Sequence, residues 1–185
     1  ITKTTEQKGR PLSLSRYFRM LVFKKMPFRI TDDEMHLLTN ICFDPEITWF
    51  SPKGVIYEKY VNYSDDTIYF LKDPRLTFKF FTSVLLQDIE LSNALLSKTP
   101  KGNMQPPHKD KSRDYSLYIP IYPNMYDYSP MTFYHNNELQ HIDNLDPGAV
   151  YLVNHKVMHS AFNFTDYDRY NLQINLEEQD ALRFI

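Results

Sequence analysis

The chain has 185 residues, of which 42% are hydrophobic and 24% are charged, with a formal net charge of -2 at pH 7. This length suits one domain with a single core, and the absence of an apolar run of roughly 20 residues argues against a membrane span. The near-neutral charge gives no general attraction for nucleic acid. We therefore expect one domain, 1–185, with neither a membrane nor a nucleic-acid partner.

Cys42 is the single cysteine, which excludes an intramolecular disulfide and a cysteine-based metal site. Isolated cysteines are typical of reducing compartments, so we expect a cytoplasmic protein. The basic stretch 16–29 could in principle contact a phosphate backbone, but a solvated face is the simpler interpretation.

The N-terminal half carries two helix signals. Thr31 and Glu34 have capping-box spacing, and apolar residues at helical spacing follow them. Asp73 and Pro74 offer an N-cap followed by a first-turn proline, and a second apolar helical face follows. We expect 1–89 to form a helical or mixed region that supports the rest of the domain.

Beyond residue 88 the pattern becomes that of short strands separated by Pro, Asn, Asp and Gly. Strands of this length and spacing indicate a sandwich or barrel, and the jelly roll is the version that most often encloses a small metal and ligand pocket. We therefore predict a mainly β fold, a double-stranded β-helix (jelly roll, cupin-like) over 90–177, with the N-terminal helices outside it. The predicted strands are 90–97, 115–122, 131–135, 138–142, 149–154, 159–164 and 169–177.

His108 and Asp110 are two residues apart, so in an extended segment both side chains can reach one ion. His141 and Asp143 form a second pair of this kind, but they precede a turn and fit a solvated strand end better. His159 lies 49 residues after Asp110, which leaves room for the hairpins of a jelly roll. Two imidazoles and one carboxylate on one face of Fe(II) leave three adjacent positions open for a bidentate co-substrate and O2.

Two further residues bear on this site. His155, in the turn before His159, competes for the role of second histidine ligand, but its turn position predicts an exposed side chain. Arg169, ten residues after His159, opens a strand with one polar face. If that face looks into the barrel, its guanidinium has the geometry for a bidentate bond to a carboxylate; a surface ion pair is the alternative.

These residues together resemble the signature of the Fe(II)/2-oxoglutarate dioxygenases, and most of all the aspartyl/asparaginyl β-hydroxylase-like branch. In that branch a glycine, a histidine and an arginine follow one another at the intervals of Gly148, His159 and Arg169. The resemblance implies that His108, Asp110 and His159 bind iron and that Arg169 holds 2-oxoglutarate. It covers about residues 90–177.

The branch also has a serine eleven residues before the first metal histidine, and this resemblance implies that Ser97 helps to bind the co-substrate. Its usual basic residue and histidine after the metal motif are replaced here by Leu117 and Ile119. Iron, or another group such as Tyr118, would then hold the 2-oxoacid end, and aspartyl hydroxylation does not transfer with the resemblance.

The resemblance implies oxidative decarboxylation of 2-oxoglutarate to succinate and CO2, coupled through O2 to hydroxylation of a C–H bond. The substrate is expected to be a small molecule or an amino-acid or peptide side chain, and the carboxylate of Asp110 argues against the halogenating variants. Two alternatives stay open: a cupin-like metal enzyme without 2-oxoglutarate, and a non-catalytic jelly-roll binding module. The loop 122–130 is either a lid over the metal or an ordinary surface loop.

Overall fold

The computed structural model describes residues 21–47, 49, 69–71, 94–111, 113–123, 131–142 and 145–184. Its helices and strands, in chain order, are β1 (Phe23–Arg29), α2 (Asp32–Cys42), β2 (Tyr69–Leu71), β3 (Ala94–Thr99), β4 (Met104–His108), β5 (Tyr115–Tyr122), β6 (Met131–His135), β7 (Glu138–Ile142), β8 (Ala149–Asn154), β9 (Met158–Phe162), β10 (Arg169–Leu176), α4 (Glu178–Ala181) and the 3₁₀ turn η2 (Leu182–Phe184).

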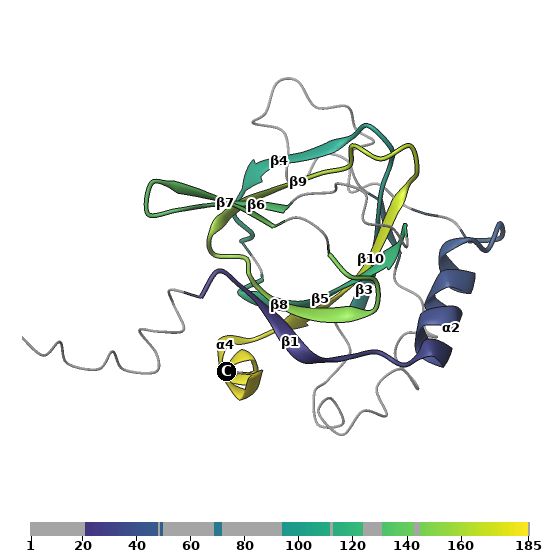
Figure 1. Cartoon of the computed structure of the whole chain (residues 1–185), viewed down its shortest axis with the longest axis horizontal. Helices are drawn as coiled ribbons and strands as arrows, with labels where there is room; N and C mark the ends of the chain where they lie inside the picture. Colours follow the sequence, from purple (N-terminus) through teal and green to yellow (C-terminus); the bar gives the residue numbers. More distant parts are fainter. Residues whose placement is uncertain are drawn as a thin grey trace, which may run out of the picture.

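The strands form two antiparallel sheets that face each other (Figure 1). Among the described residues, the major sheet has the order β1-β8-β5-β10-β3-β2 and the minor sheet the order β4-β9-β6-β7. The chain passes repeatedly from one sheet to the other, as between β3 and β4 and between β9 and β10. The fold is the double-stranded β-helix that the sequence predicts.

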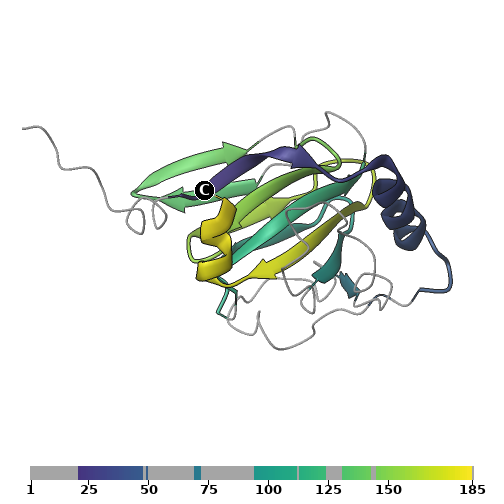
Figure 2. The same ribbon diagram turned by 90° about the horizontal axis from the view of Figure 1, so that it is seen from below.

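The outer face of the major sheet is apolar and packs against the helices. Alternate residues of its central strands point outward, where α2 covers one end of the strands and the C-terminal helical segment lies near the other (Figure 2). This core contains Leu38, Ile41, Leu96, Leu117, Ile119, Leu152, Leu172, Ile174, Ala181 and Phe184. Leu117 and Ile119, which replace the polar pair of the resembled branch, therefore face away from the barrel interior.

The inner face of the same sheet is largely polar and yet buried. On β10 the inward side chains are Arg169, Asn171 and Gln173, which alternate with outward apolar residues. Ser97 and Ser116 lie on the two neighbouring strands. A second apolar cluster, which includes Phe133, Tyr151, Val153 and Ala161, fills the part of the interior between the sheets. The barrel thus has polar groups held inside an apolar shell.

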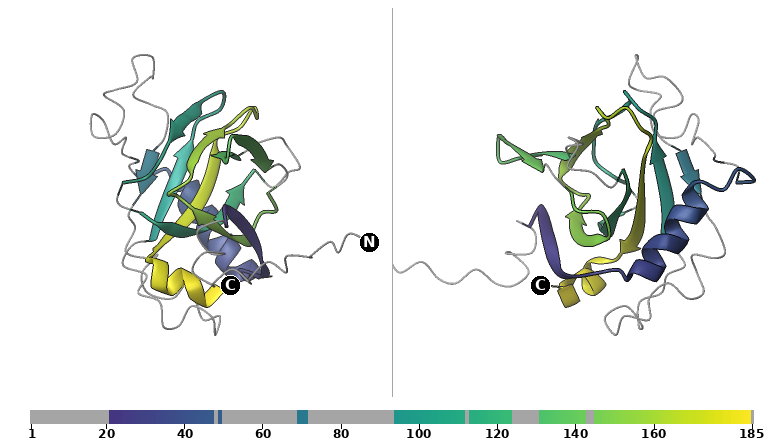
Figure 3. Two further views of the ribbon diagram at one scale, coloured as in Figure 1. Left: turned by 90° about the vertical axis from the view of Figure 1, so that its left-hand side faces the viewer. Right: turned by 45° about the vertical axis from the view of Figure 1, so that its right-hand side comes forward.

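The first predicted helix is confirmed, and its beginning follows the capping-box rule. The backbone N–H of Glu34 donates to Thr31 Oγ1 at 3.2 Å, and the Glu34 carboxylate accepts from the Thr31 N–H at 2.7 Å. Figure 3 shows α2 lying alongside the barrel wall. No helix among the described residues is long and apolar enough to cross a membrane.

Four predicted strands have the predicted bounds, namely β5, β6, β7 and β8, and β9 and β10 differ from theirs by one or two residues. β3 ends two residues later than predicted, and its predicted first residues, 90–93, lie outside the described residues. Three strands, β1, β2 and β4, were not predicted. The basic stretch 16–29 includes β1, which pairs with β8 at the edge of the major sheet. The predicted helix after Asp73 and most of the loop 122–130 lie outside the described residues.

Gly148 has a positive φ of 76° in the turn that leads into β8, where an L side chain would be strained. A Cβ at this position would also lie 3.2 Å from Arg29 Nη2. Its N–H donates to Pro120 O at 2.8 Å, and its carbonyl accepts from the Ile30 N–H at 3.0 Å. The glycine thus belongs to the turn that sets β8 between β1 and β5.

We expect Leu117→Ala to lower the free energy of unfolding by about 2–5 kcal/mol, because it leaves a cavity in the outer core. Leu117 is 0% exposed, whereas Leu139, on the outer strand β7, is 58% exposed. Leu139→Ala is therefore the matched control and should change stability by less than about 0.5 kcal/mol. Urea denaturation of both variants measures the difference; equal losses would contradict the packing described for Leu117.

Candidate metal centre

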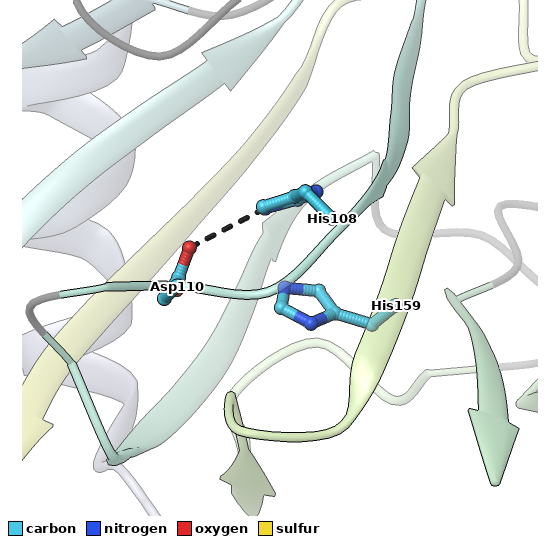
Figure 4. A group of neighbouring side chains, drawn as sticks. All are labelled: His108, Asp110 and His159. Carbon is cyan, nitrogen blue, oxygen red and sulfur yellow. Dashed lines mark ion pairs between the residues drawn. The ribbon is translucent and has the colours of Figure 1, made fainter.

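His108, Asp110 and His159 converge in the barrel interior (Figure 4). One potential ligand atom from each residue lies within 4.8 Å of the other two. His108 Nε2 is 3.4 Å from Asp110 Oδ1, and the two imidazole centroids are 4.4 Å apart. Two imidazoles and one carboxylate in a compact group are the donor set of a mononuclear transition-metal site with open positions.

The pairing of β4 with β9 brings the two histidines together. His108 and His159 are direct register partners across these antiparallel strands, and Phe133 on β6 is the register partner on the other side of His159. Cross-strand partners point to the same face of a sheet, so both imidazoles enter the barrel side by side. The Phe133 ring, 6.0 Å from that of His159, closes the site on the β6 side.

Backbone carbonyls orient both imidazoles. His108 Nδ1 donates to Pro106 O at 2.7 Å, and His159 Nδ1 donates to Val157 O at 2.9 Å. A histidine that donates from Nδ1 keeps the lone pair of Nε2 for another partner. Both rings are thus held in the tautomer in which Nε2 can bind a metal ion, and this tautomer is assigned from the hydrogen bonds.

Asp110 follows β4 in a loop that is tied to the β8–β9 turn. Its backbone N–H donates to His155 O at 3.2 Å, and the His155 N–H donates to Asp114 O at 2.9 Å. The carboxylate has two differently used oxygens. Oδ1 faces His108, whereas Oδ2 accepts from Arg113 Nε at 2.7 Å and lies 3.0 Å from His155 Nδ1.

His155 is buried, at 2% exposed, so the prediction of an exposed side chain is wrong. The loop after Asp110 covers the turn, and Ser116 Oγ lies 2.7 Å from His155 Nε2. Both ring nitrogens of His155 therefore have protein partners. His155 contacts the group of His108, Asp110 and His159 but is not one of its three members.

The rival pair lies elsewhere in the chain. His141 is exposed on β7, and Asp143 lies outside the described residues.

Burial sets the ionisation of the site at neutral pH. Burial lowers the pKa of His155 to about 3, and the positive charge of Arg113 acts in the same direction. Burial and the neighbouring His108 lower the pKa of His159 to about 4. Burial would raise the pKa of Asp110, but the hydrogen bond from His155 and the charge of Arg113 hold it well below its usual range. Asp110 is thus ionised and His159 neutral at neutral pH, as metal binding requires of these two residues.

Arg169 begins β10 and is buried on its polar inner face. Its Nη1 donates to Phe162 O at 3.1 Å, and its positive charge acts on the phenol of Tyr118. Tyr118 is buried on β5, and Thr99 is the register partner of Arg169 on β3. Neither Tyr118 OH nor Thr99 Oγ1 has a hydrogen-bond partner among the described residues.

Such orphaned buried hydroxyls cost free energy unless a ligand or water satisfies them. Beside a buried guanidinium, they are the groups expected of a carboxylate-binding pocket. Tyr118 was singled out from the sequence, whereas Thr99 was not. Thr99 could have been found from the alternation of β3, because it is two residues from Ser97 and therefore on the same face.

Ser97 is fully buried and already hydrogen-bonded within the protein. Its hydroxyl donates to Asn171 Oδ1 at 2.7 Å and accepts from Gln173 Nε2 at 3.4 Å. Because a serine has a single O–H hydrogen, Ser97 can donate to a ligand only if it releases Asn171. Its predicted contact with the co-substrate stays a prediction, and the structure gives it a role in ordering the amide groups of β10.

The fold also occurs in solved structures of other proteins. The chain is similar to a prolyl-4-hydroxylase from Pseudomonas putida, with a TM-score of 0.59 and 13% identity over 86% of this chain and 96% of that one. It is similar to HygX from Streptomyces hygroscopicus, described with nickel, 2-oxoglutarate and hygromycin B bound, with a TM-score of 0.58 and 10% identity over 89% and 86% of the two chains.

A third similar structure is SnoN, described as a non-heme α-ketoglutarate-dependent epimerase from nogalamycin biosynthesis, with a TM-score of 0.56 and 11% identity over 86% of this chain and 77% of that one. No protein-family model matches the chain, and no curated protein sequence matches it significantly. At these identities the likeness shows the fold, and the aspartyl/asparaginyl hydroxylase branch is not among the descriptions of these structures.

We expect the metal-free protein to lose stability as the pH falls from about 6.5 to about 4. In the unfolded chain His155 and His159 titrate near a pKa of about 6.5, but in the folded protein the pKa values of both are lower. Below a pH of about 6.5 the unfolded state therefore binds protons that the folded state does not bind. For each imidazole this lowers the free energy of unfolding by at most about 1.4 kcal/mol per pH unit. Urea denaturation in the presence of a chelator, from pH 7.5 to 4.5, measures this slope; His155→Gln should reduce it, and a flat profile would contradict the burial of neutral imidazoles.

We expect His108→Ala to abolish tight binding of Fe(II) or Co(II), because it removes one of three ligands. His141→Ala is the matched control, since this histidine is exposed on β7 and lies outside the group. Anaerobic titration followed by the visible spectrum of Co(II) measures both variants. Unchanged metal affinity in His108→Ala would exclude this group as the metal site.

Proposed function

We propose that the chain is an Fe(II)- and 2-oxoglutarate-dependent oxygenase that hydroxylates a C–H bond of a small molecule or of an amino-acid or peptide side chain. The observation that carries this proposal is the convergence of His108, Asp110 and His159 in the interior of a double-stranded β-helix. This donor set suits Fe(II) and leaves adjacent coordination positions for other ligands. HygX is described with 2-oxoglutarate bound and SnoN as an α-ketoglutarate-dependent enzyme, which supports the choice of co-substrate.

The protein residues divide into a metal-binding group and a carboxylate-binding group. His108 and His159 offer Nε2, and Asp110 offers Oδ1, as metal ligands. Arg169 would hold the distal carboxylate of 2-oxoglutarate by charge-assisted hydrogen bonds. The sequence suggested Tyr118 for the 2-oxoacid end, but the charge of Arg169 acts on its buried phenol, so the Tyr118 hydroxyl would instead donate to the distal carboxylate. The burial of Arg169 favours this role over a surface ion pair.

Iron bound at this site supplies the activation of O2 that couples decarboxylation of 2-oxoglutarate to oxidation of the substrate. One oxygen atom of O2 enters succinate and the other enters the substrate, so 2-oxoglutarate, O2 and R–H give succinate, CO2 and R–OH. The protein excludes bulk water through Phe133 and the apolar residues around it, and it keeps Asp110 ionised and His159 neutral.

The first test is an anaerobic titration of the purified protein with Fe(II) and then 2-oxoglutarate, followed in the visible region for the metal-to-ligand charge-transfer band. Admission of O2 and an assay for succinate complete the experiment. We expect the band, and slow formation of succinate without a substrate. Metal binding without 2-oxoglutarate binding would support the cupin-like enzyme, and binding of neither would support the non-catalytic module.

We expect Arg169→Ala to retain Fe(II) but to raise the 2-oxoglutarate concentration for half-saturation by roughly one to three orders of magnitude, since a charge-assisted bidentate pair is lost. Tyr118→Phe should raise this concentration less, because it removes one neutral hydroxyl. Arg183→Ala is the control, because it removes an arginine from the exposed surface of the C-terminal helical segment. The band titration measures all three variants; an unchanged half-saturation in Arg169→Ala would exclude Arg169 as the carboxylate anchor.

A further inference from the structure

The carboxylate of Asp110 is held from one side only. Two donors of Arg113 approach Oδ2, with Nε at 2.7 Å and Nη2 at 2.5 Å, and His155 Nδ1 lies 3.0 Å from the same oxygen. Oδ1 is instead the oxygen that faces His108 Nε2, at 3.4 Å. The three donors around Oδ2 thus fill its hydrogen-bonding capacity and leave Oδ1 for the metal ion.

His155 is itself fixed on both sides. The Ser116 hydroxyl can donate to His155 Nε2 at 2.7 Å, which leaves a hydrogen on Nδ1. Asp110 Oδ2, at 3.0 Å, is the nearer acceptor for this hydrogen, since His159 Nε2 lies 3.4 Å from Nδ1. The carbonyl of His155 also accepts from the Asp110 backbone N–H at 3.2 Å. One residue therefore holds both the backbone and the side chain of the metal ligand, and Lys156 beside it pairs with Asp114 at 2.5 Å across the same loop.

Arg113 is fixed at its other end by β10. Its Nη1 donates to Gln173 Oε1 and, at 3.4 Å, to Asn175 Oδ1. Gln173 in turn donates to Asn171 Oδ1 at 3.0 Å, and Asn171 accepts from Ser97. A continuous chain of hydrogen bonds thus joins Asp110 to the polar face of β10, which also carries Arg169.

We propose that Arg113 and His155 are positioning residues that hold Asp110 as a monodentate metal ligand through Oδ1. This inference rests on the proposed metal site and goes beyond it, because neither residue is a ligand. A carboxylate that is free to rotate can place both oxygens on one ion and occupy a second coordination position. The clamp on Oδ2 prevents this, and so keeps that position available for the co-substrate or O2.

The planar fork of arginine is needed for this geometry. Arg113 reaches Asp110 through Nε and Nη2 while Nη1 reaches Gln173, and these donors point in fixed, divergent directions. A lysine ammonium has one nitrogen and cannot make both sets of contacts. Arg113→Lys therefore keeps the positive charge at this position but removes the divergent hydrogen bonds. A change in Co(II) binding by this variant then reports on the positioning of Asp110 and not on charge.

The test uses Co(II) in place of iron, anaerobically and without 2-oxoglutarate, and compares metal affinity and the ligand-field spectrum at saturating Co(II). We expect His155→Leu and Arg113→Lys each to weaken Co(II) binding by about 10–100-fold, as is usual for residues that orient a ligand, and to shift the spectrum. His155→Asn, whose amide can donate in place of Nδ1, should restore affinity to within about threefold of the parent. Lys111→Met is the control, because Lys111 is exposed in the same loop.

The two proposals fail in different ways. If the parent binds Co(II) and forms succinate, but His155→Leu and Arg113→Lys keep its affinity and spectrum, the clamp is excluded and the metal site stands. If the parent binds no Co(II), the proposed function fails and the clamp fails with it. A misfolded variant would also lose affinity, so the unfolding midpoint of each variant is compared with that of the parent. In variants that keep this midpoint, two outcomes support the clamp: the spectral shift at saturating Co(II) and the rescue of affinity by His155→Asn.

Discussion

The antiparallel pairing of β4 with β9 is the contact on which the site depends. Because His108 and His159 are register partners, a slip of one residue would turn one imidazole out of the barrel. The neighbouring backbone then completes the arrangement, since the carbonyls of Pro106 and Val157 orient the two rings. The geometry of this candidate site therefore follows from strand register, and only Asp110 requires a loop.

A polar barrel interior is compatible with a stable fold because the two faces of the major sheet have different tasks. The outward side chains of β5, β8 and β10 form an apolar core with α2 and the C-terminal helical segment. Apolar burial on that face supplies the main stabilisation, so the inward face is free to carry Ser97, Asn171 and Gln173. These inward groups bond to one another, which offsets the cost of burying them.

Much of the β half could be predicted from the sequence because its strands alternate and are separated by turn residues. β4 could not, since Met104–His108 contains two adjacent prolines, which normally exclude a central strand. In the structure β4 lies at the edge of the minor sheet, and its register shifts between Gln105 and His108, so the missing N–H groups disrupt little pairing. The His-x-Asp motif depends on side-chain spacing alone, and that spacing survives the irregularity.

The surroundings of Asp110 could not be predicted for a different reason. His155 occupies a turn, and turn residues are usually exposed, but the loop that follows β4 folds over this one. Arg113 lies only three residues after Asp110, but this spacing alone does not predict its position. Its other partners, Gln173 and Asn175, are about 60 residues away in the sequence. The spacing of residues in the sequence therefore predicts a candidate metal ligand such as Asp110, whereas the residues that hold it become visible only in the folded structure.

The fold alone does not determine the reaction. One similar structure is described as a hydroxylase and another as an epimerase, and both are about equally like this chain. One fold can thus support different reactions, and the outcome depends on how a substrate is placed at the site. In this chain Arg113 and His155 bond to Asp110 and Phe133 lies beside His159, so these three residues serve to hold the candidate site in place.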